Sequence, residues 1–96
     1  MQVEIDHLLK YIQDSGCTFI RNGKEHDPEA TVQHIMEKYN YFKNKIESTE
    51  RFIDLCAAKS TMSNKPYKIS CPGEPLVESK AWLLQELYKF RKRNDE

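Results

Sequence analysis

Apolar residues at the start of the chain recur at the spacing of one helical face. The residues that keep this spacing are Ile5, Leu8, Leu9 and Ile12. Polar residues fill most positions between them, and this pattern predicts an amphipathic helix over residues 3–14. Gly16 should end it, because glycine adopts the left-handed conformation that often terminates a helix.

Two short segments have the pattern of strands. Residues 17–21 contain Thr, Phe and Ile, which suit a pleated surface, and they lead into Asn22-Gly23, the strongest two-residue hairpin signal. We expect a strand over 17–21, with a short stub at 24–26 as its partner in a hairpin. Residues 67–71 alternate polar and apolar side chains and predict a second strand, which the prolines and glycine that follow should end.

A long apolar stripe follows the hairpin, and Asp27-Pro28 marks the start of its helix. The stripe runs through Val32, Ile35, Tyr39, Phe42, Ile46, Thr49, Ile53 and Cys56. An unbroken helix of this length would measure about 48 Å, too long for a small domain. Ser48-Thr49-Glu50 has the composition of an internal N-cap, so we expect helices over 28–47 and 49–59.

A final helix is predicted over residues 80–93, capped by Ser79. Its buried face should consist of Trp82, Leu83, Leu87 and Phe90. With 96 residues the chain has room for a single domain, residues 1–96. The predicted fold class is therefore α+β and mostly helical: four helices and a small two-stranded antiparallel sheet made of residues 17–21 and 67–71.

The three cysteines suggest that a disulfide bond cross-links this fold. Cys17 and Cys71 each lie at one end of a predicted strand beside a turn, whereas Cys56 lies on the apolar stripe of a helix. The economical pairing is Cys17 with Cys71, which leaves Cys56 as a small buried apolar residue. Three free thiols are the alternative, and the bridge requires an oxidising compartment.

Charge and composition exclude several classes of function. The 15 Lys and Arg residues balance the 15 Asp and Glu residues, which argues against a nucleic-acid partner, because such proteins need a basic surface. No apolar run approaches the roughly 20 residues of a transmembrane segment. His26, His34 and Glu37 could be considered as metal ligands, because residues at i and i+3, such as His34 and Glu37, can share a helical face. No third ligand stands at a recognisable spacing from such a pair, so we expect no metal and no cofactor.

Catalysis has little support in the sequence. Cys17 or Ser60 could act as a nucleophile with His34, but neither lies in a nucleophile elbow or a glycine-rich phosphate loop. We therefore expect a protein that is not an enzyme. Tyr39 and Tyr41 point to different faces of one helix, so Tyr41 is a candidate exposed contact.

Several segments in matching order, from about Ile5 to Arg91, resemble the YfeK-like family of small bacterial proteins, a domain of unknown function. They are Cys17-Thr-Phe-Ile-Arg-Asn-Gly23, His34-Ile-Met-Glu-Lys-Tyr39, Thr49-Glu-Arg-Phe-Ile-Asp54, Lys59-Ser-Thr-Met-Ser63, Pro66-Tyr67 and Trp82-Leu83. The resemblance implies family cysteines at Cys17 and Cys71, which supports the bridge. The segment Met62-Ser63-Asn64-Lys65 departs from the family's usual Ser-Gly turn.

The resemblance also implies a compartment. Family members look like secreted periplasmic proteins with a cleaved signal peptide, and here Met1-Gln2-Val3 leads directly into the first helix. We therefore expect this sequence to be the mature domain with Met1 added, rather than a cytoplasmic protein. The family implies no reaction.

The same resemblance picks out polar residues at Arg21, Asn22, His34, Lys38, Tyr39 and Ser60. His34 and Lys38 lie one helical turn apart on one face. If the hairpin folds over that face, Arg21, His34 and Lys38 would converge on a small anionic ligand, with Tyr67 as an aromatic neighbour. Protonation of His34 below its usual pKa of about 6.5 should strengthen binding. The alternative is an internal salt-bridge role with Glu37 or Asp54.

We therefore expect a periplasmic binding or interaction module that recognises an unidentified protein or a small anionic ligand. Two alternatives come from other classes of protein. One is an envelope-associated hydrolase with His34 as the base, and the other is a structural accessory subunit.

Overall fold

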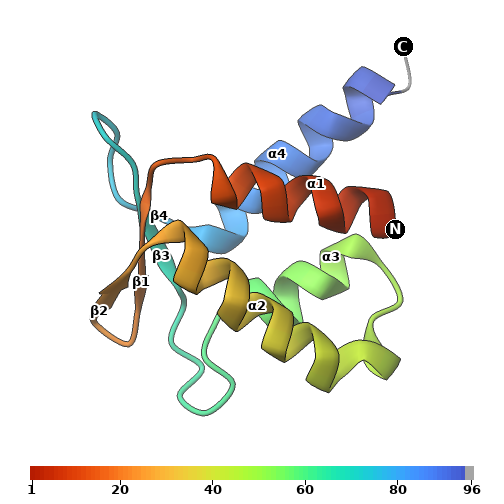
Figure 1. The fold of residues 1–96 in the computed structure, drawn as a ribbon, viewed down its shortest axis with the longest axis horizontal. Coiled ribbons are helices and arrows are strands. Elements are labelled where there is room, and N and C mark those ends of the chain that lie inside the picture. The colour runs from red at the N-terminus through yellow and green to blue at the C-terminus, as the bar shows by residue number, and fades with distance from the viewer. Residues whose placement is uncertain (95–96) are drawn as a thin grey trace.

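The helices of the computed structural model lie on one side of a small antiparallel sheet, as Figure 1 shows. The structure describes residues 1–94. In chain order its elements are α1 (Gln2–Gln13), β1 (Thr18–Arg21), β2 (Lys24–His26), α2 (Pro28–Phe42), η1 (Lys43–Lys45), α3 (Thr49–Phe52), η2 (Ile53–Ala57), β3 (Lys68–Ser70), β4 (Val77–Glu78) and α4 (Ser79–Asn94). The predicted fold class, α+β with four main helices, is confirmed.

The sheet has four strands in the order β2-β1-β3-β4. Asn22 and Gly23 both have positive φ, at 51° and 79°, which is the conformation of the predicted hairpin turn. The predicted pairing of the strands near 17–21 and 67–71 is confirmed, with Phe19 opposite Ile69, and so is the stub at 24–26. The expectation of only two strands is wrong, because β4 adds to β3 through two residues too short to show a pattern.

Helix boundaries follow local capping chemistry where the cap is a single side chain. The Asp27 carboxylate accepts from the Ala30 N–H at 2.8 Å and begins α2. The chain breaks before residue 49 as predicted, and the Ser48 hydroxyl accepts from the Arg51 N–H at 3.1 Å. The helices on either side are shorter than predicted, because α2 ends in the 3₁₀ turn η1 and α3 widens into the π-helical turn η2.

Ser79 does not cap α4 as predicted, because it is already inside the helix. Its hydroxyl instead donates to the carbonyl oxygen of Ala57 at 2.6 Å. The serine is 2% exposed, so this bond ties α4 to η2 within the core. A local sequence pattern cannot predict long-range contacts of this kind.

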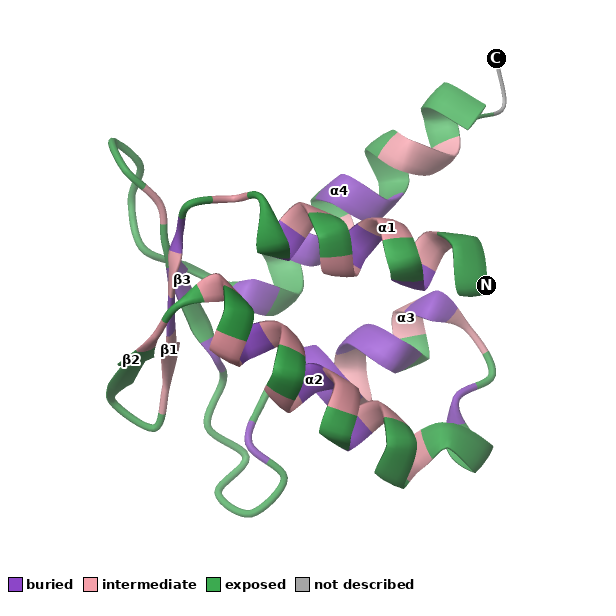
Figure 2. Ribbon diagram, in the orientation of Figure 1, coloured by how far each residue is buried: buried purple, intermediate pink, exposed green. Residues whose placement is uncertain are grey.

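The core lies between the sheet and the helices, where Figure 2 shows the buried positions turned inward. Its fully buried side chains include Phe52, Ile5, Leu8, Ile12, Ile53, Ile69, Leu83 and Leu87. Strand alternation explains why Phe19 and Ile69 belong to it: they oppose each other on the face of the sheet that meets the helices. The other face of the sheet points away from the core.

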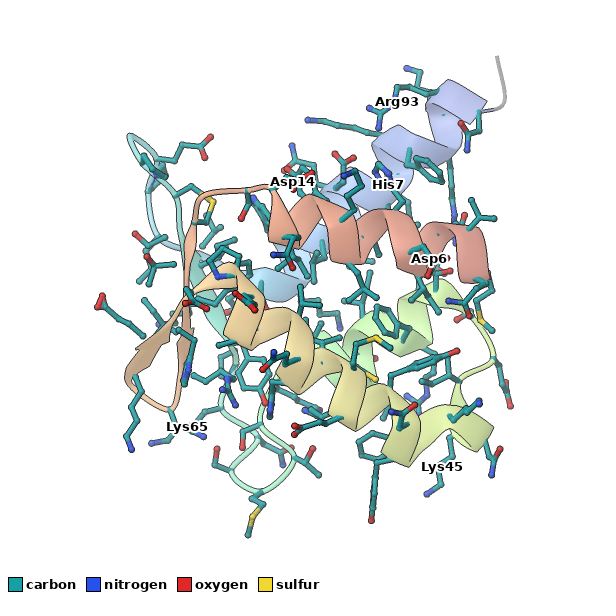
Figure 3. All side chains as sticks on the ribbon, in the orientation of Figure 1. Asp6, His7, Asp14, Lys45, Lys65 and Arg93 are labelled. Carbon is teal, nitrogen blue, oxygen red and sulfur yellow. A yellow bond between two sulfur atoms is a disulfide. The ribbon has the colours of Figure 1, made fainter. Side chains whose placement is uncertain are left out.

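Polar contacts tie the helices together at the end away from the sheet. The Arg91 guanidinium of α4 donates to Glu4 of α1 at 2.7 Å and to Glu50 of α3 at 2.7 Å. The hydrogen bond from Arg91 lowers the pKa of Glu4 to about 2. His7 of α1, labelled in Figure 3, lies 2.6 Å from the Glu86 carboxylate of α4. The sequence pattern predicted none of these contacts.

The predicted bridge between Cys17 and Cys71 is confirmed, with a sequence separation of 54 and an S–S distance of 2.07 Å. It connects the chain entering β1 to the chain leaving β3, next to the central strand pair of the sheet. Cys56 is a free thiol that is 0% exposed. Burial raises the pKa of Cys56 to about 11, so the thiol is unreactive near neutral pH.

We expect the bridge to supply a large part of the stability. Replacing both cysteines, Cys17→Ala with Cys71→Ala, should lower the free energy of unfolding by about 4 kcal/mol, because the open chain regains the entropy of a 54-residue loop. The melting temperature should fall by about 15–30 °C. Calorimetry of oxidised wild-type and variant protein measures both quantities.

The matched control is fully reduced wild-type protein, which should melt close to the reduced double variant. Thiol titration of denatured, unreduced wild-type protein should find one thiol per chain, that of Cys56. Three thiols, or a double variant as stable as oxidised wild type, would contradict the predicted role of the bridge.

Candidate functional site

The four residues predicted to bind an anion lie together between β1, α2 and the start of β3. Arg21 ends β1 and shares a face with the core residue Phe19, because residues two apart in a strand point the same way. His34 and Lys38 lie one turn apart on α2. Tyr67 immediately precedes β3. The hairpin therefore brings Arg21 over the helix face that carries His34 and Lys38.

Lys38 is the most buried charged residue of this group, at 9% exposure. It follows Thr31 and Ile35 on the buried stripe of α2. Its Nζ donates to the backbone oxygen of Lys59 at 2.8 Å and to Tyr67 Oη at 3.3 Å. Two of its three N–H groups thus have partners, and neither partner carries a negative charge.

Tyr67 joins Lys38 to His34. Its hydroxyl lies 3.2 Å from His34 Nε2 and is also the acceptor for the Lys38 ammonium. A tyrosine hydroxyl that accepts from an ammonium still has its own proton to donate. We therefore assign the neutral His34 tautomer that accepts at Nε2 and carries its proton on Nδ1.

Arg21 has few protein partners for a half-buried guanidinium. One terminal nitrogen lies 3.3 Å from His26 Nδ1, and its buried Nε has no hydrogen-bond partner among the described residues. An arginine has five N–H donors and no acceptor. Most of the N–H donors of Arg21 therefore have no hydrogen-bond partner among the described residues.

Burial and mutual repulsion both oppose positive charge here. Burial, followed by the charges of Arg21 and Lys38, lowers the pKa of His34 to about 4. Burial also lowers the pKa of Lys38, with Arg21 adding to the effect. The pKa of Tyr67 is raised by burial. His34 is consequently neutral at physiological pH, and the predicted strengthening of binding below pH 6.5 is moved toward pH 4.

The alternative of an internal salt bridge with Glu37 or Asp54 is wrong. Asp54 pairs with Lys80 of α4 at 2.7 Å, and Glu37 is exposed. Across residues 1–94 neither Arg21 nor Lys38 forms an ion pair with a carboxylate. The packing of η2 against α4 decides this outcome, because it places Asp54 beside Lys80.

The interior of the site is small. Arg21, His34 and Tyr67 line a cavity of about 10 Å³, together with Thr31, Ser79 and apolar core residues. That volume accommodates about one water-sized group. A ligand that reaches the cavity can place one atom inside and must keep the rest at the surface.

His26 also belongs to this site, although from the sequence it was a candidate only as a metal ligand. It accepts from Arg21 and its pKa is lowered by burial, followed by the charges of Arg21 and Lys24. The hairpin register could have predicted this position of His26. His26 pairs with Phe19, so the two side chains lie on the same inner face of the sheet. Between residues 1 and 94 no three His, Cys, Asp or Glu side chains form a metal-binding group.

Two further observations bear on function. Tyr41, the predicted exposed contact, is 82% exposed on α2. Within the part of the chain that the structure describes, no helix combines the length and apolar character needed to cross a membrane.

Comparison with known proteins identifies relatives without an assigned activity. A family of unknown function, DUF5329, matches residues 1–91. The chain is 39% identical over 67 residues to "Uncharacterized protein YfeK" of Salmonella typhimurium, a match that covers 69% of this chain and 56% of that protein. The chain therefore matches little more than half the length of that relative. No solved structure gives a significant match.

The lowered His34 pKa predicts how stability depends on pH. Between about pH 4 and pH 6.5 the unfolded chain binds more protons than the folded chain, because His34 is charged only in the unfolded state. The free energy of unfolding should therefore decrease as the pH is lowered from about 6.5 to about 4, by at most about 3 kcal/mol from His34. Urea unfolding at a series of pH values measures the slope.

The variant His34→Gln should flatten that slope. His26→Gln is the matched control and should flatten it less, because the downward shift of the His26 pKa is the smaller of the two. A His34→Gln protein with the wild-type slope would contradict the assignment of a neutral, buried His34.

Proposed function

This chain belongs to the DUF5329 family, and because that family's function is unknown, we propose from the geometry of the site that the protein is a binding module for an oxyanion. Its ligand carries a phosphate, sulfate or carboxylate group, and Arg21, His34, Lys38 and Tyr67 form the recognition site. The proposal extends to a partner protein or a small molecule that presents such a group.

The observation that carries the proposal is an excess of hydrogen-bond donors. Arg21 uses one terminal nitrogen on His26, and the Arg21 Nε has no protein partner. The Nδ1–H of His34, as assigned above, and the third N–H of Lys38 are further donors. Within residues 1–94 no carboxylate offsets the two positive charges. Uncompensated, partly buried cations are costly in a protein, and an anionic ligand would offset that cost.

The size of the cavity defines how the ligand would bind. With about 10 Å³ inside, one oxygen of the ligand reaches the Arg21 Nε, and the remaining oxygens face the outer donors of Arg21 and His34. A terminal oxyanion group can be bound in this way. Binding then depends on charge and donor geometry more than on buried area.

The geometry favours binding over hydrolysis. His34 is neutral near pH 7 and could accept a proton, but its Nε2 already contacts Tyr67 Oη. No serine, threonine or cysteine within residues 1–94 forms a hydrogen bond with His34. A hydrolase with His34 as the base would need a nucleophile positioned by that ring, so the binding function has the better support.

We further propose that the module works in the periplasm. The Cys17–Cys71 disulfide supports an oxidising compartment, because such bridges persist in secreted and periplasmic proteins and are rare in the cytosol. A role as a structural accessory subunit would share this compartment, and it differs from our proposal in requiring no oxyanion.

Titration with inorganic phosphate, sulfate and acetate tests the proposed function. Backbone amide shifts in NMR spectra should move saturably around residues 20–26, 34–38 and 67 with at least one of the three anions. Arg21→Gln should weaken that binding about tenfold or more, because a hydrogen bond between charged groups contributes about 1.5–3 kcal/mol. Affinity should also fall as sodium chloride rises.

Lys24→Gln is the matched control, since Lys24 is an exposed cation in the same hairpin. It should retain nearly the full affinity. If none of the anions binds, or if Arg21→Gln and Lys24→Gln weaken binding equally, recognition at this site is disproved and only general surface charge remains.

A further inference from the structure

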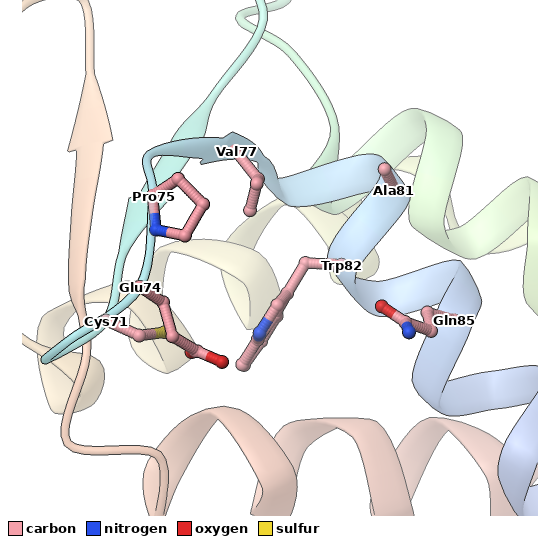
Figure 4. A pocket seen from close by; sticks show the side chains of 7 residues that line it. All are labelled: Cys71, Glu74, Pro75, Val77, Ala81, Trp82 and Gln85. Carbon is pink, nitrogen blue, oxygen red and sulfur yellow. The ribbon is translucent and has the colours of Figure 1, made fainter.

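A second hollow lies beside Cys71 of the bridge, between the β3–β4 connection and α4. It has a volume of about 240 Å³ and is shown in Figure 4. Glu74, Pro75 and Val77 line it from the connection and β4, and Trp82 and Gln85 line it from α4. None of these residues takes part in the site around Lys38.

The Trp82 indole is held in place before any ligand arrives. One side of it stacks on the Tyr11 ring with a centroid distance of 4.5 Å, and the Trp82 and Phe19 rings meet at a steep angle with a centroid distance of 5.8 Å. Tyr11 does not line the hollow, so the hollow lies against the part of the indole that Tyr11 leaves uncovered. A rigid aromatic surface of this kind binds a planar or cationic group with little loss of side-chain entropy.

Glu74 makes the hollow acidic. Figure 4 shows its carboxylate end directed toward the Trp82 ring. Glu74 is the only charged residue that lines the hollow, and no ion pair or side-chain hydrogen bond within residues 1–94 uses its carboxylate. The negative charge of Glu74 acts on Tyr11: the pKa of Tyr11 is raised by burial and, to a smaller extent, by the charges of Glu86 and Glu74.

We infer that this hollow is a binding site for an arginine side chain of a partner protein. The guanidinium stacks on the Trp82 indole and donates a pair of parallel N–H bonds to the Glu74 carboxylate. The arginine methylene groups lie along Pro75 and Val77, and the Gln85 side-chain oxygen is a further acceptor. A guanidinium suits the hollow better than an ammonium, because it is planar and more weakly hydrated.

Intrinsic fluorescence gives a direct readout, because Trp82 is the single tryptophan of the chain. The probe is Nα-acetyl-arginine amide, whose only charge is the guanidinium. Its neutral isostere, Nα-acetyl-citrulline amide, has nearly the same shape, and Nα-acetyl-lysine amide carries the other basic group. A single side chain in a shallow site should bind with a dissociation constant on the order of 1–10 mM.

The arginine probe should change the Trp82 fluorescence saturably and bind about two- to fivefold more tightly than the citrulline probe, the range expected for one solvent-exposed charge pair. In Glu74→Gln the two probes should bind equally, because the difference between them comes from the Glu74 carboxylate. Glu47→Gln is the matched control for a lost negative charge and should preserve the discrimination, since Glu47 is exposed and does not line the hollow.

Three results would overturn the assignment: no saturable change with any probe, equal binding of the arginine and citrulline probes by wild-type protein, or tighter binding of the lysine probe. These outcomes are independent of the oxyanion site, because the probes are cationic or neutral and the variants leave Arg21 and Lys38 unchanged. Failure here and failure of the proposed function are therefore separate results.

Discussion

The buried ammonium of Lys38 is the constraint on which the arrangement of the site depends. A lysine on the buried stripe of a helix must find acceptors, because an unpaired buried charge destabilises the fold by several kcal/mol. Lys38 finds them in the Lys59 carbonyl and the Tyr67 hydroxyl. These bonds connect α2 to the loop between η2 and β3, and they place Tyr67 so that it also meets His34.

The backbone around Tyr67 is held from both directions, which keeps this arrangement in register. Its N–H donates to the Ala58 carbonyl at 2.9 Å, and its own carbonyl accepts from Ser79 at 2.9 Å. The Cys17–Cys71 bridge joins the chain segments that flank β1 and β3. The sheet is thereby fixed over α2, and Arg21 at the end of β1 lies above His34 rather than in solvent.

Local chemistry could be predicted from the sequence, and long-range packing could not. Asp27, Ser48 and Asn22-Gly23 act on residues within four positions of themselves, so their patterns carried enough information. The convergence of Arg21, His34, Lys38 and Tyr67 followed from the family resemblance and the hairpin. Strand β4 and the hydrogen bond from Ser79 to Ala57 depend on residues about 10 to 20 positions away, and no periodic pattern in the sequence predicts such contacts. The lack of a carboxylate at the site depends on Asp54 pairing with Lys80.

The central claim is that the positive charge around Lys38 is left uncompensated for an anionic ligand. The most direct measurement is the pKa of Lys38, followed by NMR of its Cε and Nζ with and without inorganic phosphate. The account predicts a value below the usual range for lysine in the absence of phosphate, because burial opposes the charge. Saturating phosphate should raise that pKa, because a bound anion stabilises the charged form. A Lys38 pKa that changes with none of the three anions, phosphate, sulfate and acetate, would contradict the account and leave the cluster with a role in the fold alone.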